Sequence, residues 1–361
     1  MAAEKKVEAL VDPTYHEYHF GKESPDFEAH YSEAYHDYRR RWSENPRNFI
    51  VEDFPIHLDI EPTNICNLKC PMCSRTIKAY DSEEGLGDMG FMKWELYTKV
   101  IDEGVKHGLS SIKLNYQGEP LIHPRIVDMV KYAKDKGVVE VMFNTNGSFL
   151  TEKKARGLIE AGLDKLILSF DSPYKKQYDE IRIGAKYEKI LANIKRFREV
   201  RDEMGAVFPI IRASMVDFHE ADEEQVRQDF VKLFDGIADF ISFVDLTDHR
   251  AVDKIDWDAL PEDFTSDHSC AQIWQRLFVW WDGKVTPCCN DYEQKMLLGD
   301  ANTDSLHEIW KGPQLTKWRK LHEDGKYFTM EVCAQCDHVL CDKKIMQYAR
   351  TEEDLKRAQN F

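Results

Sequence analysis

Short apolar segments of strand length alternate with amphipathic helical segments through the middle of the chain. The strand candidates run almost continuously apolar and lie at 56–62, 111–118, 139–147, 165–171, 209–216 and 239–246. The helical patterns fall between them, at about 92–107, 124–136, 151–162, 186–204 and 221–235. Buried strands separated by single helices are typical of βαβ units, in which a parallel sheet is covered by helices. The pattern therefore predicts an α/β fold.

Six such units fit a partial (β/α)6 TIM-like barrel, and the roughly 190 residues from 56 to 246 are enough to build one. An open, doubly wound sheet would give the same periodicity, so the pattern leaves that alternative open. Both architectures place ligand chemistry at the carboxyl ends of the strands. Polar motifs follow the first four strands at that position, in the order NIC, GEP, NTNG and SFDSP. We expect the active site at this edge of the sheet.

The alternation is absent at both ends of the chain. The first 50 residues are rich in Tyr, His, Glu and Arg and predict an amphipathic helical arm that packs on the body. Beyond about residue 250, FVWWDGKVTPCC predicts a β-hairpin with a two-residue turn at Asp282-Gly283. We expect a helical arm, a barrel, a small cysteine-bearing domain and a C-terminal helix, at 1–50, 51–250, 251–345 and 346–361.

Charge and composition narrow the kind of protein. The chain has 65 acidic and 49 basic side chains, a formal net charge of −16, and such a surface repels nucleic acid and anionic lipid. With 42% hydrophobic residues the chain can bury a large core. It has no apolar run near the ~20 residues that span a bilayer and no signal-peptide pattern at its N-terminus. We predict a cytoplasmic protein that binds neither membrane nor nucleic acid.

The nine cysteines are grouped rather than scattered. Three form a first group between residues 66 and 73, none occurs from 74 to 269, and six form a second group between 270 and 341. The number is odd, and a reducing cytoplasm disfavours disulfides. Grouping of this kind therefore indicates metal ligands.

Cys66, Cys70 and Cys73 lie in one short loop after the first strand, with the spacing C-x3-C-x2-C. Three thiolates can hold three irons of a four-iron cluster and leave the fourth iron without a protein ligand. An open metal position is what a catalytic site needs to bind a small molecule. Zinc would prefer four ligands in a closed geometry. His57 or His123 could complete such a set, but neither has the usual zinc spacing.

This loop resembles that of the radical S-adenosylmethionine (SAM) superfamily. The resemblance implies a [4Fe–4S] cluster on the three cysteines, whose open iron chelates the amino and carboxyl groups of SAM. It further implies that one electron cleaves SAM to methionine and a 5′-deoxyadenosyl radical, which removes a hydrogen atom from the substrate. An electron donor of the flavodoxin or ferredoxin type would supply that electron.

The same resemblance assigns SAM contacts at later strand ends: Met72, Gly118, Glu119, Pro120, Asn144, Thr145, Asn146, Ser169, Asp171 and Arg212. Met72 would lie near the adenine, and Glu119 of the GEP motif would accept from the SAM ammonium group. Asn144–Asn146 would meet the ribose and methionyl region, where Ser169 of the S-x-D motif would also reach the ribose or carboxylate. The guanidinium of Arg212 could pair bidentately with the SAM carboxylate.

The second cysteine group resembles the C-terminal extension known as a SPASM or twitch domain. Its spacing is C-x12-G-x4-C followed by C-x2-C, and the implied ligands of one auxiliary [4Fe–4S] cluster are Cys270, Cys288, Cys333 and Cys336. A four-cysteine zinc ribbon would fit the same pairs. Two auxiliary clusters would need at least seven ligands and only six cysteines are present, which favours the twitch-like case. Cys289 and Cys341 are then unassigned, although Cys341 could replace one of the four.

An auxiliary cluster beside the substrate can accept the second electron of an oxidation that begins with hydrogen abstraction. Family members with one auxiliary cluster include dehydrogenases of an aminocyclitol alcohol, and we expect similar chemistry on a small polar, sugar-like metabolite. Epimerisation, dehydration and the maturation of a ribosomal peptide stay open as alternatives, as does an electron-carrying scaffold. A base would be needed for the alcohol proton, and the candidates are Asp245, Asp248, His249 and Asp291.

Overall fold

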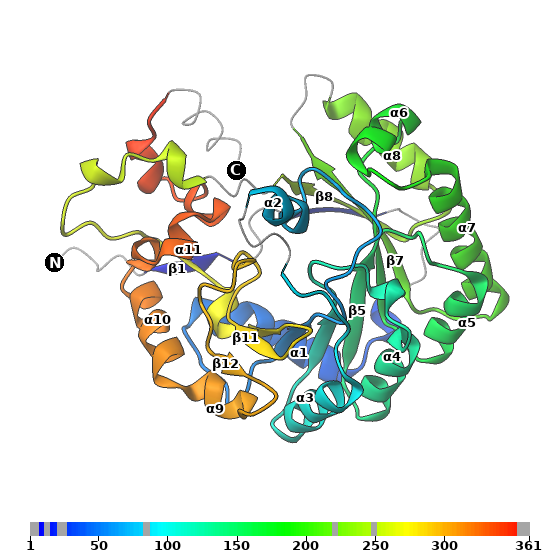
Figure 1. Ribbon diagram of the computed structural model, residues 1–361, viewed down its shortest axis with the longest axis horizontal. Coiled ribbons are helices and arrows are strands. Elements are labelled where there is room, and N and C mark those ends of the chain that lie inside the picture. The colour runs from blue at the N-terminus through cyan, green and yellow to red at the C-terminus, as the bar shows by residue number, and fades with distance from the viewer. Residues whose placement is uncertain are drawn as a thin grey trace.

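The computed structural model describes residues 7–10, 15–19, 27–81, 87–218, 223–246 and 251–351. Within them, helices and strands form a mixed α/β structure in which a curved sheet is wrapped on its outer side by helices (Figure 1). Ten strands belong to that sheet, in the order β12-β11-β10-β3-β4-β5-β6-β7-β8-β2, and β1 and β9 form a separate pair. None of the described helices is long and apolar enough to cross a membrane.

Six parallel strands in chain order make the centre of the sheet: β3 (His57–Ile60), β4 (Ser111–Leu114), β5 (Glu140–Thr145), β6 (Lys165–Ser169), β7 (Ile210–Asp217) and β8 (Phe240–Asp245). The predicted helices that connect them are α3 (Trp94–Lys106), α4 (Ile126–Asp135), α5 (Glu152–Glu160), α7 (Tyr187–Glu203) and α8 (Glu223–Phe234). They lie on the convex side (Figure 1), whereas a doubly wound sheet carries helices on both faces. The expected partial barrel is therefore confirmed. Two shorter helices fall outside the predicted patterns, α2 (Ser74–Asp81) and α6 (Lys175–Ile181).

On β7, one face of the strand packs against helices and the other does not. On β7, Ile211, Ala213 and Met215 are buried in the main apolar core, which also contains residues of α8. Arg212 and Ser214 alternate with them, so they lie on the opposite face, towards the barrel interior. At β7 the concave side of the sheet therefore carries polar side chains.

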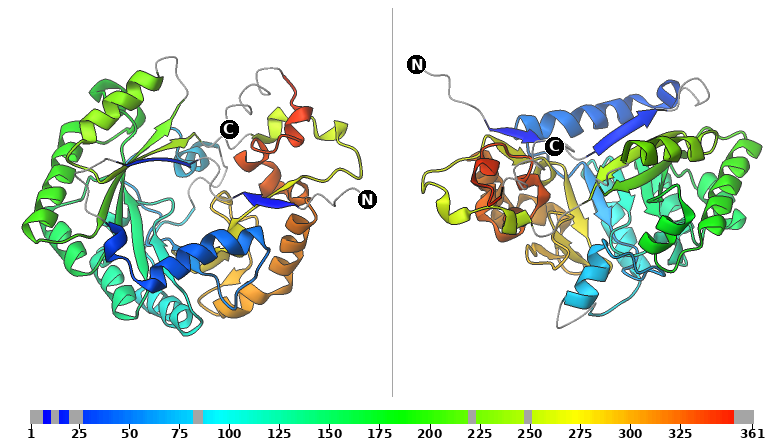
Figure 2. Two further views of the ribbon diagram at one scale, coloured as in Figure 1. Left: turned by 180° about the vertical axis from the view of Figure 1, so that it is seen from behind. Right: turned by 90° about the horizontal axis from the view of Figure 1, so that it is seen from above.

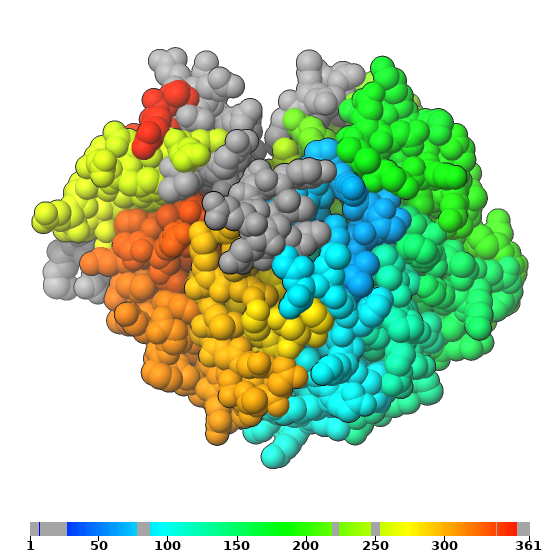
Figure 3. Space-filling model, viewed as in Figure 1, coloured from blue at the N-terminus to red at the C-terminus, as the bar shows by residue number. Residues whose placement is uncertain are grey.

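The strands of the C-terminal region continue the barrel sheet. β10 (Arg276–Val279) pairs in parallel with β3, and β11 (Lys284–Thr286) and β12 (Gly299–Asp300) follow in antiparallel order. Leu277 and Val285 are buried in the same apolar core as the barrel residues. In the space-filling view this region, coloured yellow to orange, lies directly against the cyan part of the barrel (Figure 3). The extension and the barrel thus share one core.

The predicted hairpin forms, but its turn has three residues rather than two. The Trp280 N–H donates to the Lys284 carbonyl at 2.9 Å, and the Gly283 N–H donates back to the Trp280 carbonyl at 3.0 Å. Gly283 has φ 101°. A three-residue turn of this kind requires left-handed backbone at its last position, which glycine adopts without steric strain. The two-residue turn expected at Asp282-Gly283 is therefore wrong by one residue.

The N-terminal arm contains strands as well as the expected helix. α1 (Glu33–Arg47) lies across the back of the molecule and buries Trp42 there (Figure 2). β1 (Glu8–Leu10) pairs with β9 (His268–Cys270), and β2 (Tyr15–His19) pairs with β8. Because β2 covers the outer edge of β8, it occupies backbone groups that would otherwise be an exposed sheet edge.

The rest of the extension consists of short helices, coloured orange and red in Figure 1: α9 (Leu306–Lys311), α10 (Pro313–Glu323), α11 (Glu331–Ala334) and the 3-10 turn η8 (Ile345–Tyr348). A second, smaller core lies here, built from Ile255, Tyr327, Val339, Leu340, Ile345 and Met346. Of the C-terminal helix expected at 346–361, residues 346–351 fall within the described part. Residues 346–348 belong to the 3-10 turn η8, and residues 349–351 are not helical. Residues 352–361 lie outside the described residues.

Candidate functional site

A cavity of about 230 Å³ opens at the carboxyl ends of β3, β4, β5 and β6. It brings together most of the predicted site residues: Cys66, Cys70, Met72, Cys73, Gly118, Glu119, Asn144, Thr145, Asn146 and Ser169. The other side chains in its wall are Leu68, Arg75, Thr76, Asn115, Tyr116, Gln117 and Arg182. The polar motifs that follow successive strands therefore surround one space, as parallel strands require.

The cysteine loop is fixed by its own polar residues. The Thr63 hydroxyl donates to the Gly90 carbonyl at 2.6 Å and accepts from the Ile65 N–H at 3.1 Å. At the other end of the loop, Cys73 directly precedes α2, and its N–H donates to the Cys70 carbonyl at 3.1 Å. The three sulfurs are therefore held by backbone geometry that does not depend on a bound ligand.

Gly118 is the point at which the end of β4 approaches this loop. A Cβ atom at residue 118 would lie 2.0 Å from the Thr63 carbonyl oxygen and 2.9 Å from that of Ile65. The next residue, Glu119, donates its N–H to the Ile65 carbonyl at 2.9 Å. Only glycine lets the two backbones come this close, so Gly118 has a steric reason to be glycine that is separate from any contact with a ligand.

Glu119 is buried and receives three hydrogen bonds. Oε1 accepts from the Thr145 hydroxyl at 2.7 Å and the Leu121 N–H at 3.0 Å, and Oε2 accepts from the Asn146 N–H at 2.8 Å. Burial raises the pKa of Glu119, and these hydrogen bonds oppose the rise. A carboxylate has about four acceptor positions. Glu119 can therefore accept from one further donor, such as an ammonium group in the cavity.

Asn144 contributes a buried acceptor that has no partner. Its Oδ1 atom lies in the cavity wall without a hydrogen bond, while its backbone N–H donates to Asn115 Oδ1 at 3.2 Å. Leaving such a group unsatisfied costs about 1–3 kcal/mol. A hydroxyl or ammonium donor on a ligand would remove that cost, so this orphaned oxygen fits a polar ligand such as SAM.

Two side-chain donors approach the sulfurs of the cysteine loop. Asn146 Nδ2 lies 3.9 Å from Cys66 Sγ, and Arg182 Nη1 lies 3.8 Å from Cys70 Sγ. Burial raises the pKa of Cys66 to about 11 and also raises that of Cys70. Buried thiols become good ligands when a metal displaces their protons, and the two donors then stabilise the resulting thiolates.

The cysteine sulfurs of the described residues are not arranged as in a closed zinc site. In a tetrahedral site with Zn–S bonds of about 2.3 Å, the sulfurs would lie about 3.8 Å apart. In the part of the chain that the structure describes, no three cysteine sulfurs lie within 4.8 Å of one another. A four-iron cluster holds one thiolate on each iron and so spreads its ligands further apart.

Three predicted SAM contacts do not line the cavity. Pro120 is buried at the start of a 3-10 turn. Asp171 is buried and pairs with Nε of Arg182, so it orients that guanidinium instead of facing the cavity. Ser169 of the cavity wall pairs with Ser214 of β7. Arg212 precedes Ser214 by two residues and therefore lies deeper in the barrel than Ser169. A direct SAM contact by Arg212 stays a prediction.

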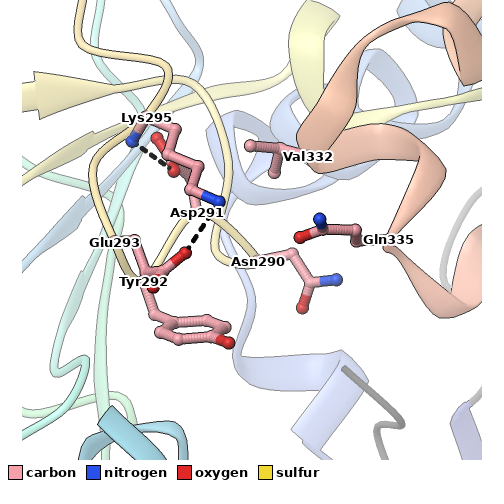
Figure 4. Close-up of a pocket in the computed structure, with 7 residues that line it drawn as sticks. All are labelled: Asn290, Asp291, Tyr292, Glu293, Lys295, Val332 and Gln335. Atoms are coloured by element: carbon pink, nitrogen blue, oxygen red, sulfur yellow. Dashed lines mark hydrogen bonds and ion pairs between the residues drawn. The ribbon is translucent and has the colours of Figure 1, made fainter. Parts of the chain in front are cut away.

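The predicted bases are dispersed. Asp245 ends β8 opposite Asp217 and is not part of the cavity wall, while Asp248 and His249 lie outside the described residues. Asp291 lines a separate small hollow (Figure 4), where its two carboxylate oxygens accept from the N–H groups of Lys295 and Met296, each at 2.7 Å. Burial raises its pKa to about 6. Asp291 therefore holds its own loop together, and its role as the base stays a prediction.

The second cysteine group gathers around the end of β9. The Cys289 thiol and burial raise the pKa of Cys288 most, and the nearby thiols of Cys336 and Cys270 add to the rise. Burial likewise raises the pKa of Cys333, to which Cys270 contributes. Cys270 thus acts on both Cys288 and Cys333, and Cys336 acts on Cys288, as expected for thiols of one group.

A buried histidine lies between two of these cysteines. His322 Nδ1 is 3.4 Å from the N–H of Cys270, which donates to it, and 3.1 Å from the Ser269 hydroxyl. Because Nδ1 is the acceptor, the proton of the neutral ring belongs on Nε2. Nε2 lies 3.9 Å from Cys333 Sγ and can therefore donate to it.

Two hydrogen bonds join the two cysteine groups. The Tyr116 hydroxyl donates to the Cys289 carbonyl at 2.5 Å, and Gln117 Nε2 donates to the Tyr292 carbonyl at 3.3 Å. Tyr116 and Gln117 line the cavity, whereas Cys289 and Tyr292 follow the predicted ligand Cys288. The loop of the second group is thus tied to the wall of the first site.

The sequence predictions missed several residues of the cavity wall. Asn115, Tyr116 and Gln117 directly precede the GEP motif, and their position just after β4 is a signal that could have identified them. Arg182 follows α6 and belongs to no motif, so only the fold brings it to Cys70.

Two protein-family models match the chain. Residues 60–220 match the model described as "Radical SAM superfamily", and residues 270–337 match the SPASM model, described as an iron–sulfur cluster-binding domain. The first match contains the cysteine loop and the four strand ends of the cavity. The second begins at Cys270 and ends just after Cys336.

Curated relatives and solved structures cover most of the chain at low identity. A tungsten-containing aldehyde ferredoxin oxidoreductase cofactor-modifying protein of Pyrococcus furiosus is 26% identical over 78% of this chain and 89% of its own length. An S-adenosyl-L-methionine-dependent 2-deoxy-scyllo-inosamine dehydrogenase of Niallia circulans is 22% identical over 78% of this chain and 92% of its own length.

Two solved structures share the fold. BtrN in complex with AdoMet and 2-DOIA has a TM-score of 0.52 at 20% identity, over 80% of this chain and 94% of its own. Streptococcus suis SuiB bound to the precursor peptide SuiA has a TM-score of 0.54 at 15% identity, over 78% of this chain and 70% of the SuiB chain. The same fold therefore occurs with a small-molecule ligand and with a peptide.

Proposed function

Because the chain belongs to the radical SAM superfamily and carries a SPASM domain after its barrel, we propose that it dehydrogenates a small, polar, hydroxylated metabolite. The observation that carries this proposal is the pair of hydrogen bonds from Tyr116 and Gln117 to the loop that follows Cys288. They hold the second cysteine group against the cavity, so an electron left on the substrate has a short path to an auxiliary cluster. That arrangement suits a two-electron oxidation.

The residues of the first site would bind and orient the reactants. When bound, the cluster on Cys66, Cys70 and Cys73 supplies the electron that cleaves SAM, and a flavodoxin- or ferredoxin-like protein would deliver it. Glu119 and Asn144 offer acceptors for the ammonium and hydroxyl groups of SAM. Their burial strengthens these hydrogen bonds, because water does not compete for the same oxygens.

Oxidation of an alcohol to a ketone removes one hydrogen atom, one proton and one electron. We propose Lys113 as the group that takes the proton. Lys113 is not part of the cavity wall but lies below it, on the same face of β4 as the wall residue Asn115 and on the opposite face from the core residues Ile112 and Leu114. Burial lowers its pKa, which favours the neutral amine that a base must be.

Relatives supply a second line of support. The dehydrogenase of Niallia circulans and the BtrN complex both concern small molecules by their descriptions. The present chain matches each of them over more than nine-tenths of its length. Coverage of the solved structures does not favour either class, because anSMEcpe with a bound peptide is also matched over 94% of its chain. The metabolite class is proposed on the dehydrogenase relative, which is matched over 92% of its length.

The proposal is tested with anaerobically reconstituted, dithionite-reduced protein, SAM, and a panel of polyols, sugars and aminocyclitols. We expect 5′-deoxyadenosine to form, and a ketone to form in equal amount with the matching alcohol. A substrate deuterated at the carbinol carbon should place deuterium in the 5′-deoxyadenosine. Formation of an epimer or a dehydrated product in place of the ketone would refute dehydrogenation, and turnover of peptides alone would refute the metabolite class.

A further inference from the structure

Asp53, His107 and His307 present three potential metal ligands within 4.8 Å of one another. We propose that they form a binding site for a divalent transition-metal ion of the zinc type, separate from both cysteine groups. Asp53 precedes β3, whereas the cysteine loop follows it, so this site lies at the opposite end of the strand from the cavity.

The distances match a tetrahedral site. His107 Nδ1 lies 3.2 Å from Asp53 Oδ2, and His307 Nε2 lies 3.0 Å from Asp53 Oδ1. Two ligands bound to zinc at about 2.0 Å in tetrahedral geometry are about 3.3 Å apart. The two rings are stacked with 20° between their planes, so an ion could replace the two shared protons once the rings turn to point their nitrogens at it.

The segment that carries His307 is anchored to the barrel before any ion binds. The His307 N–H and the Ser305 hydroxyl both donate to Glu103 of α3, at 3.0 and 2.6 Å. The ring of His107 stacks with those of His307 and Phe54, with centroids 4.2 and 5.8 Å away. The backbone of His307 therefore loses little freedom on binding, and the two histidine rings need only turn about their side-chain bonds.

The site is open to solvent at its acidic ligand. The Asp53 side chain is 67% exposed, while those of His107 and His307 are 23% and 30% exposed. An ion can therefore enter from solvent and keep a water molecule as its fourth ligand. Lys311 Nζ, 3.9 Å from Asp53 Oδ1, is the competing cation that the ion would displace.

An ion at this position would join the two parts of the protein. Asp53 and His107 belong to the barrel, whereas His307 belongs to α9 of the extension, and α3 and α9 lie side by side (Figure 1). Because the ion would bind the folded arrangement and not the separated segments, it should stabilise the junction between barrel and extension.

The test uses cluster-loaded full-length protein, so that iron already occupies the cysteines. After incubation with excess Zn²⁺ and gel filtration, we expect about one zinc ion per chain, an unchanged iron content and a higher Tm. His307→Gln and His107→Gln should lose the zinc ion and the rise in Tm. Glutamine can still donate to Asp53, so these variants should fold.

His36→Gln, which removes an exposed histidine of α1, is the matched control and should keep both effects. Lys311→Gln should bind zinc more tightly than the wild type, because it removes the competing cation. Wild-type protein that retains no zinc would overturn the proposal, as would equal zinc content in the wild type and in both histidine variants of the site.

Discussion

Arg182 donates from Nη1 to the sulfur of Cys70 across 3.8 Å. Its Nε pairs with the buried carboxylate of Asp171, so the guanidinium is held from behind while it faces the cysteine loop. The S-x-D motif at the end of β6 thus acts on the first cysteine group through an arginine. A cation beside a thiolate ligand favours the more negative, reduced state of a cluster.

Replacing Arg182 with methionine should make the first cluster harder to reduce. A charge-assisted hydrogen bond is worth about 1.5–3 kcal/mol, so we expect 5′-deoxyadenosine formation to fall about 10- to 100-fold with iron content preserved. The measurement is the cluster's midpoint potential by spectroelectrochemical titration, together with the rate of SAM cleavage. Arg40→Met, at an exposed position of α1, is the control. An unchanged potential in Arg182→Met would contradict the assigned role.

Gly118→Ala should disrupt the cysteine loop by steric overlap. The added Cβ would lie 2.0 Å from the Thr63 carbonyl oxygen, which is backbone and cannot rotate away. We expect a loss of about 2–3 kcal/mol in the free energy of unfolding and a lower iron content after reconstitution. Gly157→Ala is a suitable control, since its Cβ would meet only the Val127 side chain at 3.2 Å. Equal stability of the two variants would show that the loop can move aside.

The sequence predicted the parts of the site that depend on position along a strand. Gly118, Glu119 and Asn144–Asn146 follow directly from the rule that parallel strands end at one edge, and the cavity contains them. Arg182 and His322 could not be found in this way, because neither follows a barrel strand: Arg182 lies 112 residues from Cys70 in the chain, and His322 lies in α10, 11 residues before Cys333.

The contacts of Asp291, one of the expected bases, could not be predicted from the sequence for a different reason. Its position after a cysteine pair was visible in the sequence, but the use of both its oxygens by backbone N–H groups was not. The strands β1 and β2 were missed because their partners lie more than 200 residues away in the chain, as the pairing of His16 with Phe243 illustrates. Local pattern carries no information on such pairings.

The iron content should separate the two cysteine groups. Two four-iron clusters predict about eight irons per chain in the wild type and about four in the Cys66/Cys70/Cys73→Ala variant. Iron and sulfide are counted after anaerobic reconstitution. Cys289→Ser and Cys341→Ser are the matched controls and should keep about eight irons. About twelve irons in the wild type would instead require a second auxiliary cluster, and a loss of four in Cys341→Ser would make Cys341 a ligand.

His322 should tune the auxiliary cluster through its hydrogen bond to Cys333. Donors to a ligand sulfur stabilise the reduced state, so His322→Leu should lower the midpoint potential of that cluster. The titration is best done in the Cys66/Cys70/Cys73→Ala background, which leaves one cluster to observe. Ser269→Ala removes a different hydrogen bond of the His322 ring without touching sulfur and should leave the potential unchanged. If both variants shift the potential equally, the ring acts only by filling space, and the 3.9 Å approach of Nε2 to Cys333 has no electrostatic role.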